Sequence, residues 1–204
     1  MSRYTGPITK LSRRLGIMLF TNGQSKSKAF QKKNYKPGEH GQKRFRQSSE
    51  YNKQLQEKQK ARFMYGISEK QCRKYYELAN KSDEVTGTQF LKLLEQRLDN
   101  VVYRAGFAAT RPQARQIVSH GIVMVNGKKV KTPSILVSAG DKIEVRENKK
   151  KSQLFEEAKN SKVKTPKWLK SELKSLSAEV IALPDSQDIE RAINSQLITE
   201  YYSK

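Results

Sequence analysis

The pattern of apolar and polar positions becomes helical only from Ser48 onward. Residues 49–65 repeat with helical spacing, yet their cations outnumber the apolar anchors Tyr51 and Leu55. A helix of this kind is too polar to be held by one apolar face, so we expect it to lean on a charged partner. Gly66 is placed to end it.

Two further helical patterns follow, and both are typical of core elements. Ser68 and Gln71 have the spacing of a capping box, in which each side chain satisfies a backbone donor at the helix start. The apolar stripe that follows Thr86 keeps helical spacing up to Gly106. This stripe predicts one continuous helix between those two residues.

The next stretch, TRPQARQIVSHGIVMVNGKKV, predicts a short helix that runs directly into a tight β-hairpin. Thr110 and Gln113 have capping-box spacing, and Gly121 is placed to close the helix. Asn126 and Gly127 can supply the positive φ angles of a type I′ turn. The runs SILV and KIEV, joined by the turn SAGD, extend the local order to helix, helix and short strands, which predicts a small α+β unit.

Charge changes the picture more than any single motif does. The 204 residues include 41 Lys and Arg against 20 Asp and Glu, a formal net charge of +21. Such a chain repels itself unless an anion is nearby, which points to nucleic acid or to acidic lipid. No run approaches the ~18 apolar residues of a membrane span, and no basic helix carries a broad apolar face, so nucleic acid is favoured and a membrane is not.

The N-terminal stretch is the most basic part of the chain. Residues 1–62 hold 16 Lys and Arg against 3 acidic residues, a net charge of +13. Up to about Arg46 there are few large apolar residues and no sustained period, so this stretch cannot bury enough surface to fold alone. We expect residues 1–47 to form a basic, irregular extension that becomes ordered along nucleic acid; the alternative is a solvated tail.

The predicted helix and hairpin gather cations in a small space. Arg111 and Arg115 are four positions apart and share a helix face beside the apolar stripe, so we expect their guanidinium groups to reach outward and bind phosphate. Lys128 and Lys129 flank the turn and add point charges. Ordinary surface charge is the alternative for all four residues.

The chain lacks the residues of familiar catalytic and metal sites. Its two histidines, His40 and His120, are not in an H-E-x-x-H motif, and GIVMVNGKK does not have the spacing of a phosphate-binding loop. Each histidine is as well explained by a structural role as by an RNA contact. The one cysteine, Cys72, is at helical spacing with apolar neighbours and is expected to be a core thiol. We expect no catalytic residue, no metal and no cofactor.

Several motifs resemble one family. RLDNVVYRAGFAATRPQARQIVSHGIVMVNGKKV is similar to the RNA-binding module of the small-subunit ribosomal protein four family, and KPGEHGQKR resembles the N-terminal signature of that family. The resemblance runs from MSRYTGP through LPDSQD to NSQLITEYYSK, which is essentially the whole chain. The module alone would say less, since a similar one is appended to pseudouridine synthases and tyrosyl-tRNA synthetases.

The resemblance implies a fold of class α+β in two main parts. A helical domain, formed by residues 48–90 with the C-terminal tail 185–204, packs on an α+β RNA-binding module, formed by residues 91–184. The module has two helices and short antiparallel strands, and its helix-hairpin core spans residues 97–146. Residues 1–47 remain as the basic extension.

The resemblance also implies partners and a cellular place. Members bind small-subunit ribosomal RNA where several helices meet in the 5′ domain, early in assembly. They later line the path along which messenger RNA enters, beside small-subunit ribosomal protein five, and contribute to translational accuracy. Some repress their own messenger. The place implied is a ribosome, either in a bacterial cytoplasm or in an organelle.

Many relatives bind zinc through four cysteines in this extension, but the matching region here offers only hydroxyls such as Thr9 and Ser12, which are poor zinc ligands. The resemblance therefore implies no zinc in this chain.

We expect binding to depend on phosphates and RNA shape rather than on base sequence, because A-form RNA hides its major-groove edges. The basic and histidine residues expected to contact RNA are Arg3, Arg13, Arg14, His40, Lys43, Arg44, Arg46, Lys53, Lys58, Arg62, Arg111, Arg115, His120, Lys128 and Lys129.

Two other classes of protein remain as alternatives at this point. A pseudouridine synthase could carry the same module, but the remaining residues are too few and too basic for a catalytic domain. An assay of uridine isomerisation distinguishes it. A free DNA-binding protein is compatible with the charge alone, and competition between ribosomal RNA and duplex DNA separates the two.

Overall fold

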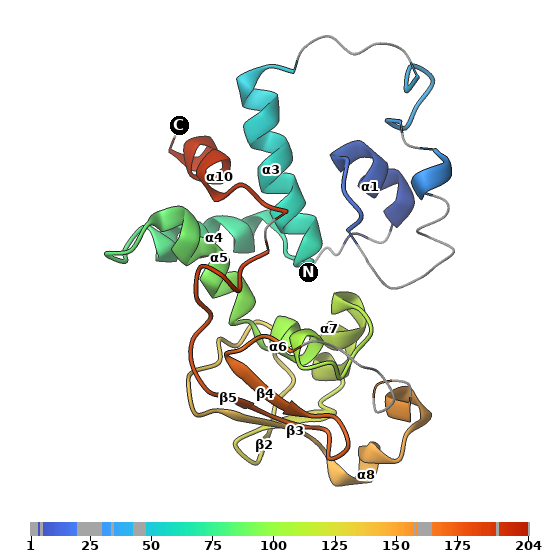
Figure 1. Ribbon diagram of the computed structural model, residues 1–204, viewed down its shortest axis with the longest axis vertical. Helices are drawn as coiled ribbons and strands as arrows, with labels where there is room; N and C mark the ends of the chain where they lie inside the picture. The colour runs from blue at the N-terminus through green and yellow to red at the C-terminus, as the bar shows by residue number, and fades with distance from the viewer. Residues whose placement is uncertain are drawn as a thin grey trace. The chain divides into compact units, whose positions relative to one another are not determined.

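The structure is a computed structural model in which the chain forms two compact units (Figure 1). The first unit contains both chain ends, Met1–Phe90 and Glu190–Lys204, and the second is the continuous segment Leu91–Ile189. The residues that the structure describes are 4, 6–19, 30–33, 35–42, 48–156, 158, 165–190 and 192–203.

The first unit is helical. Its elements are α1 (Ile8–Leu15), α3 (Glu50–Met64), α4 (Glu69–Ala79), the start of α5 (Thr86–Glu95) and α10 (Ser195–Tyr202). The C-terminal helix α10 packs along α3, and α1 lies against α3 as well. The longest of these helices, α3, therefore has neighbours from both ends of the chain.

The inward side of α3 is unusually polar. Gln54 and Lys58 are buried there together with Ala61 and Met64. Gln54 donates a hydrogen bond from Nε2 to Oε2 of Glu200 on α10, at 3.0 Å. Glu200 of the same chain is thus one charged partner of this helix.

The extension contains a helix that its sequence pattern did not predict. Leu11 and Leu15 on α1 are buried, as is Leu19 beyond its end. The ring of Tyr4 packs edge-on against Phe63 of α3, with centroids 5.5 Å apart. Two leucines spaced by four residues are too little for an isolated helix, but they suffice where a neighbouring helix offers surface to bury them.

The expected continuous helix from Thr86 to Gly106 is instead two helices. Helix α5 ends at Glu95, and α6 (Leu98–Arg104) begins after Arg97, whose backbone is extended with φ −62° and ψ 136°. Arg97 forms an isolated antiparallel bridge with Leu136. The SILV run, expected as a strand, forms this bridge and main-chain hydrogen bonds on either side of it. These bonds hold Arg97 in an extended conformation and so interrupt the helix that the local pattern favours.

The second unit is an antiparallel sheet with helices α6 and α7 (Arg111–Ser119) on one face (Figure 1). The strand order is β2-β1-β3-β5-β4. The strands are β1 (Val123–Val125), β2 (Lys128–Lys129), β3 (Lys142–Val145), β4 (Leu169–Glu172) and β5 (Ser177–Val180), and the short α8 (Glu147–Lys150) and the 3₁₀ turn η1 (Gln153–Phe155) follow β3.

Period-two burial of the strands places the core between sheet and helices. Val123 pairs with Val145, and Ile143 and Val145 are fully buried while Glu144 between them is not. These side chains join one apolar cluster with Val102 of α6 and Val118 of α7. The predicted α+β class, with a helical part and a module of two helices and antiparallel strands, is confirmed.

The hairpin between β1 and β2 has the predicted turn. Asn126 and Gly127 have φ values of +50° and +75°, the positive pair that a type I′ turn requires. Asn126 also ties the turn to β3, because its side chain donates to Asp141 Oδ1 at 2.8 Å and accepts from the Lys142 amide at 2.9 Å. The hairpin tip is therefore fixed to its neighbouring strand as well as closed upon itself.

At the start of α7, only one of the two hydrogen bonds expected of a capping box is present. The Thr110 hydroxyl accepts from the Gln113 amide at 3.3 Å. The Gln113 side chain, however, accepts from the amide of Ala109 at 2.8 Å, one residue earlier than in a capping box. Gly121, with φ +63°, follows the last turn in the left-handed conformation predicted for it.

Candidate nucleic-acid interface

The lysines of the hairpin lie over the C-terminal end of α7. A Cβ atom added at Gly121 would come within 2.6 Å of Cε of Lys129 and 3.1 Å of Cγ of Lys131, so the two aliphatic stems pass directly over this glycine. Lys128, Lys129 and Lys131, together called the hairpin cations below, are all exposed, and so is His120 at the helix end. A helix C-terminus favours neighbouring positive charge, so this placement adds little electrostatic strain.

The two arginines of α7 are placed differently from the expectation. Arg111 donates from Nε to Oδ1 of Asn100 at 2.8 Å, and its guanidinium carbon lies 4.7 Å from the ring centre of Tyr103. Arg115 forms an ion pair from Nη1 to Oδ2 of Asp99 at 3.2 Å, and 18% of its side chain is exposed. Neither guanidinium simply reaches outward, because both are held by groups on α6.

These groups belong to a buried polar network at the start of α6. Arg97 is fully buried and donates from Nε and Nη2 to the two carboxylate oxygens of Asp99, at 3.1 and 2.7 Å. Asn100 donates to Glu95 Oε2 at 2.6 Å, and Arg104 binds both oxygens of Glu95 at 3.0 and 2.7 Å. We call Glu95, Arg97, Asp99, Asn100 and Arg104 the α6 network.

The α6 network holds the arginines of α7 in place, and these arginines keep their positive charge. It brings two carboxylates against Arg97 and Arg104, and both Arg111 and Arg115 bind to its side chains. A guanidinium has five N–H donors, so it can bind protein oxygens and a phosphate at the same time. The arginines of α7 can therefore serve as preset donors, with a structural role that the sequence pattern did not reveal.

Helix α3 also uses its cations internally. Lys58, expected to contact phosphate, is only 4% exposed; its Nζ lies 2.9 Å from Oε1 of Glu69 and 4.5 Å from the ring centre of Tyr201. Arg62 pairs with the same carboxylate at 3.2 Å. Lys58 is thus a buried structural cation, which corrects the expectation, whereas Lys53 is exposed and pairs with Glu50 at 2.6 Å.

Glu69 is the centre of this cluster. Burial alone would raise its pKa, but hydrogen bonds from Lys58, from the hydroxyl of Tyr202 at 2.9 Å and from Arg62 lower the pKa below its ordinary value. The carboxylate is therefore ionised at neutral pH and holds α3, α4 and α10 together. Cys72 lies beside it, fully buried, and burial raises the pKa of its thiol to about 11, as expected for a core thiol.

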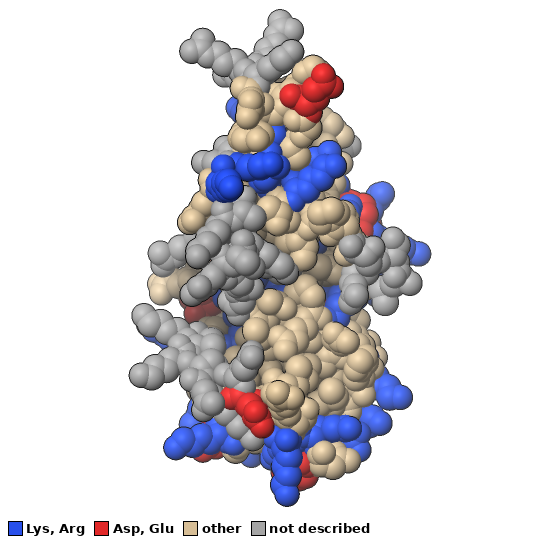
Figure 2. All heavy atoms as spheres, turned by 90° about the vertical axis from the view of Figure 1, so that its right-hand side faces the viewer, with Lys and Arg blue, Asp and Glu red and all other residues tan. Residues whose placement is uncertain are grey.

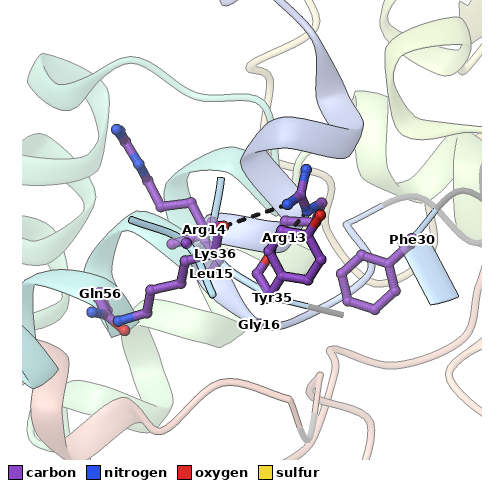
Figure 3. Close-up of a pocket in the computed structure, with 9 residues that line it drawn as sticks. Arg13, Arg14, Leu15, Gly16, Phe30, Tyr35, Lys36 and Gln56 are labelled. Atoms are coloured by element: carbon purple, nitrogen blue, oxygen red, sulfur yellow. Dashed lines mark hydrogen bonds between the residues drawn. The ribbon is translucent and has the colours of Figure 1, made fainter. Parts of the chain in front are cut away.

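The extension forms a cavity with α3. Figure 3 shows the lining side chains, with the rings of Tyr35 and Phe30 beside Arg13, and with Arg14 and Gln56 toward the other end. Its volume is about 380 Å³. Arg13 donates from Nε to the carbonyl of Tyr35 at 2.9 Å, and its guanidinium carbon lies 4.7 Å from the Tyr35 ring centre, so this arginine builds the wall of the cavity.

The remaining residues that were expected to contact RNA are either exposed or lie outside the residues that the structure describes. His40 is exposed in a turn next to Gly41, whose amide binds the carbonyl of Gly38. Four expected RNA contacts lie outside the described residues: Arg3, Lys43, Arg44 and Arg46. Figure 2 shows one face of the molecule, on which Lys and Arg side chains clearly exceed Asp and Glu side chains.

The described part of the chain has no helix long and apolar enough to cross a membrane. Within the same residues, no group of three or more His, Cys, Asp and Glu side chains is arranged to hold a metal ion.

Comparison with known proteins covers the whole chain. Residues 3–95 match the Ribosomal protein S4/S9 N-terminal domain, and residues 96–143 match the S4 domain. The chain is 50% identical over 207 residues to small ribosomal subunit protein uS4 of Sulfurihydrogenibium sp. and 49% identical over 208 residues to uS4A of Alkaliphilus oremlandii. It is 48% identical over 209 residues to uS4 of Caldicellulosiruptor saccharolyticus.

Each of these alignments covers 100% of both chains. These relatives are ribosomal proteins and not pseudouridine synthases, so the enzyme alternative is excluded. The S4 domain match begins inside the buried polar network and contains α7 and the hairpin cations. The chain therefore belongs to the small ribosomal subunit protein uS4 family.

Proposed function

We propose that this chain is a structural constituent of the small ribosomal subunit that binds small-subunit ribosomal RNA directly. The end-to-end match to uS4 proteins, at about half of all aligned positions, carries this proposal. The exposed hairpin cations beside α7, within the S4 domain match, support it physically. Such a surface suits A-form RNA, whose phosphates and 2′-hydroxyls are more accessible than its base edges.

We further propose a division of work along the chain. Residues 1–47 and the module 91–184 supply most of the RNA contacts, and residues 48–90 together with the C-terminal residues 185–204 form the helical body. The described side chains best placed for RNA contact are exposed or partly exposed cations and histidines: Arg14, His40, Lys53, Arg111, Arg115, His120, Lys128 and Lys129.

Family membership supports finer proposals about the role in the ribosome. The chain would bind early to a junction of RNA helices in the 5′ domain and later help to form the path along which messenger RNA enters, beside small-subunit ribosomal protein five. We also propose that the chain contributes to translational accuracy and represses its own messenger. The three relatives above come from bacteria, which favours a bacterial ribosome over an organellar one.

Competition binding tests the central proposal. Labelled cognate small-subunit ribosomal RNA is bound to the full chain at ~0.15 M salt and challenged with unlabelled RNA or duplex DNA. We expect RNA to displace the label at much lower concentration than DNA, because non-specific binding to DNA weakens steeply at this salt. Equal displacement by the two competitors would contradict the proposal and favour a general nucleic-acid-binding protein.

Chemical footprinting then tests the finer proposal. We expect protection to concentrate where helices of the 5′ domain converge, and to weaken locally when Lys128 and Lys129 are changed to Gln. Protection spread evenly over the RNA would argue against a junction as the binding site.

A further inference from the structure

The cavity of the extension has features that general phosphate binding does not require. Two of its lining residues, Phe30 and Tyr35, are aromatic, and Gln56 brings an amide from α3 (Figure 3). One face of Tyr35 is occupied by Arg13, which is itself held by the main-chain carbonyls of Tyr35 and Lys36. The aromatic wall is therefore built by hydrogen bonds inside the protein.

The charge at this cavity is of one sign. Among the described residues that line it, none is acidic, and Arg13, Arg14 and Lys36 are basic. Arg14 is exposed and makes no hydrogen bond or ion pair with the residues that the structure describes. This differs from α3 and α7, where the cations are held by protein carboxylates or amides. An anion is the complementary occupant of such a site.

The volume of the cavity limits which anions can bind in it. A volume of about 380 Å³ is near the lower end of the roughly 300 to 1,000 Å³ that pockets for small molecules span. That is too little for a nucleic-acid helix. A ligand that consisted only of a phosphate group would not contact the aromatic rings. Single-stranded RNA, in contrast, is commonly bound with its bases stacked on aromatic side chains and its phosphates paired with cations.

We propose that this cavity holds one unstacked nucleotide of the small-subunit ribosomal RNA, with its base against Phe30 and its phosphate near Arg14 and Lys36. This inference rests on the proposed function and adds a site of single-nucleotide recognition to it. The extension then binds RNA through a defined pocket in addition to its diffuse charge.

The test compares two substitutions of one residue. Phe30→Leu keeps an apolar side chain but removes the aromatic ring, and Phe30→Tyr keeps the ring. For binding to cognate small-subunit ribosomal RNA, we expect the leucine variant to lose about tenfold in affinity and the tyrosine variant to bind as the native chain does. A purely structural apolar role would predict little loss for leucine.

A matched pair of charge variants examines the phosphate side. Arg14→Gln and Lys10→Gln each remove one exposed cation from α1, but only Arg14 lines the cavity. We expect Arg14→Gln to weaken RNA binding several-fold more than Lys10→Gln. Equal effects would show that the charge acts diffusely and would overturn the phosphate contact.

Ultraviolet cross-linking of the unaltered protein to the same RNA does not depend on how any variant folds. We expect a single nucleotide to be linked to the peptide that contains Phe30, and the same base to become reactive to base-specific reagents when the leucine variant is bound.

The outcomes separate the two proposals. If the native chain does not prefer ribosomal RNA to duplex DNA, the proposed function fails. If the native chain prefers the RNA, but no cross-link forms near Phe30 and both Phe30 variants bind alike, the nucleotide site is overturned and the proposed function stands.

Discussion

The cations of α7 and those of the neighbouring hairpin have the same sign and lie close together, yet they are held very differently. Arg111 and Arg115 are bound to side chains of the α6 network, while Lys128 and Lys129 are exposed beside a turn. Arginine, with its rigid fork of donors, can bind a protein oxygen and a phosphate together, whereas lysine acts as a mobile point charge. Formal charge is therefore a poor guide to which residues bind RNA and which also maintain the fold.

The largest effect is expected from removing the charge that both α7 and α6 depend on. Asp99→Asn removes the carboxylate charge that pairs with fully buried Arg97, and we expect the free energy of unfolding to fall by about 3–5 kcal/mol. Denaturant unfolding measures this. As a control, Glu179→Gln removes an exposed carboxylate from β5 and should change stability by less than about 0.5 kcal/mol. Similar values for the two variants would contradict a structural role for the α6 network.

A smaller effect is expected where the same kind of pairing is more exposed. Glu69→Gln removes the partner of buried Lys58, but 44% of the glutamate side chain is exposed, so we expect a loss of about 2 kcal/mol at neutral pH.

This effect has a pH dependence of known sign. Since the pKa of Glu69 is lowered in the folded state, its stabilisation is complete above the ordinary value of 4.5 and is lost as the pH falls through the lowered value. The difference between the native chain and the Gln variant should therefore shrink only below about pH 4.5. A difference that stays constant to lower pH would show that Lys58 does not depend on this carboxylate.

Arg115→Gln should have an intermediate effect on stability. The substitution removes one of the two arginines that bind Asp99 while Arg97 remains, so we expect a loss of about 1 kcal/mol together with weaker RNA binding. Thermal unfolding and RNA titration of the same preparation check both parts. Unchanged stability would mean that the α7 arginines are ordinary surface charges after all.

The hairpin cations provide the contrasting case. Changing Lys128 and Lys129 together to Gln should alter the free energy of unfolding by less than about 0.5 kcal/mol. If both bind phosphate, the slope of log affinity against log salt should become shallower by roughly 1.4 to 1.8 units. The double variant Lys170→Gln and Lys174→Gln, on exposed positions near β4, serves as the control. Equal slopes for the two double variants would contradict a specific RNA contact by the hairpin.

Local signals could be predicted from the sequence because they depend on a few adjacent residues. Ser68 and Gln71 form the expected capping box, and Asn126 and Gly127 have the expected positive φ angles. In each case the backbone requirement and the residue that meets it lie within four positions. The small α+β unit followed from the same local patterns, whereas its combination with a helical domain was implied by the family resemblance.

Features that depend on distant residues could not be predicted in this way. The helix break at Arg97 comes from pairing with Leu136, and the burial of Lys58 comes from Glu69 and Tyr201. Strands β4 and β5 are only four residues long, and an alternation over four residues is too short to distinguish a strand from a chance pattern. The cavity beside Phe30 joins residues from α1, residues 30, 35, 36 and 41, and α3, a combination that no local motif indicates.

The closure of the first unit by α10 constrains the order in which the protein can be completed. Gln54 and Glu200 are joined across 146 positions, and Tyr202 and Glu69 across 133, whereas the second unit is one continuous segment. Because a chain emerges from its N-terminus during synthesis, α3 is made before the second unit and its partner helix α10 is made after it. The newly made chain can thus complete its RNA-binding module before α10 is available to pack on α3, and the helical unit is completed only afterwards.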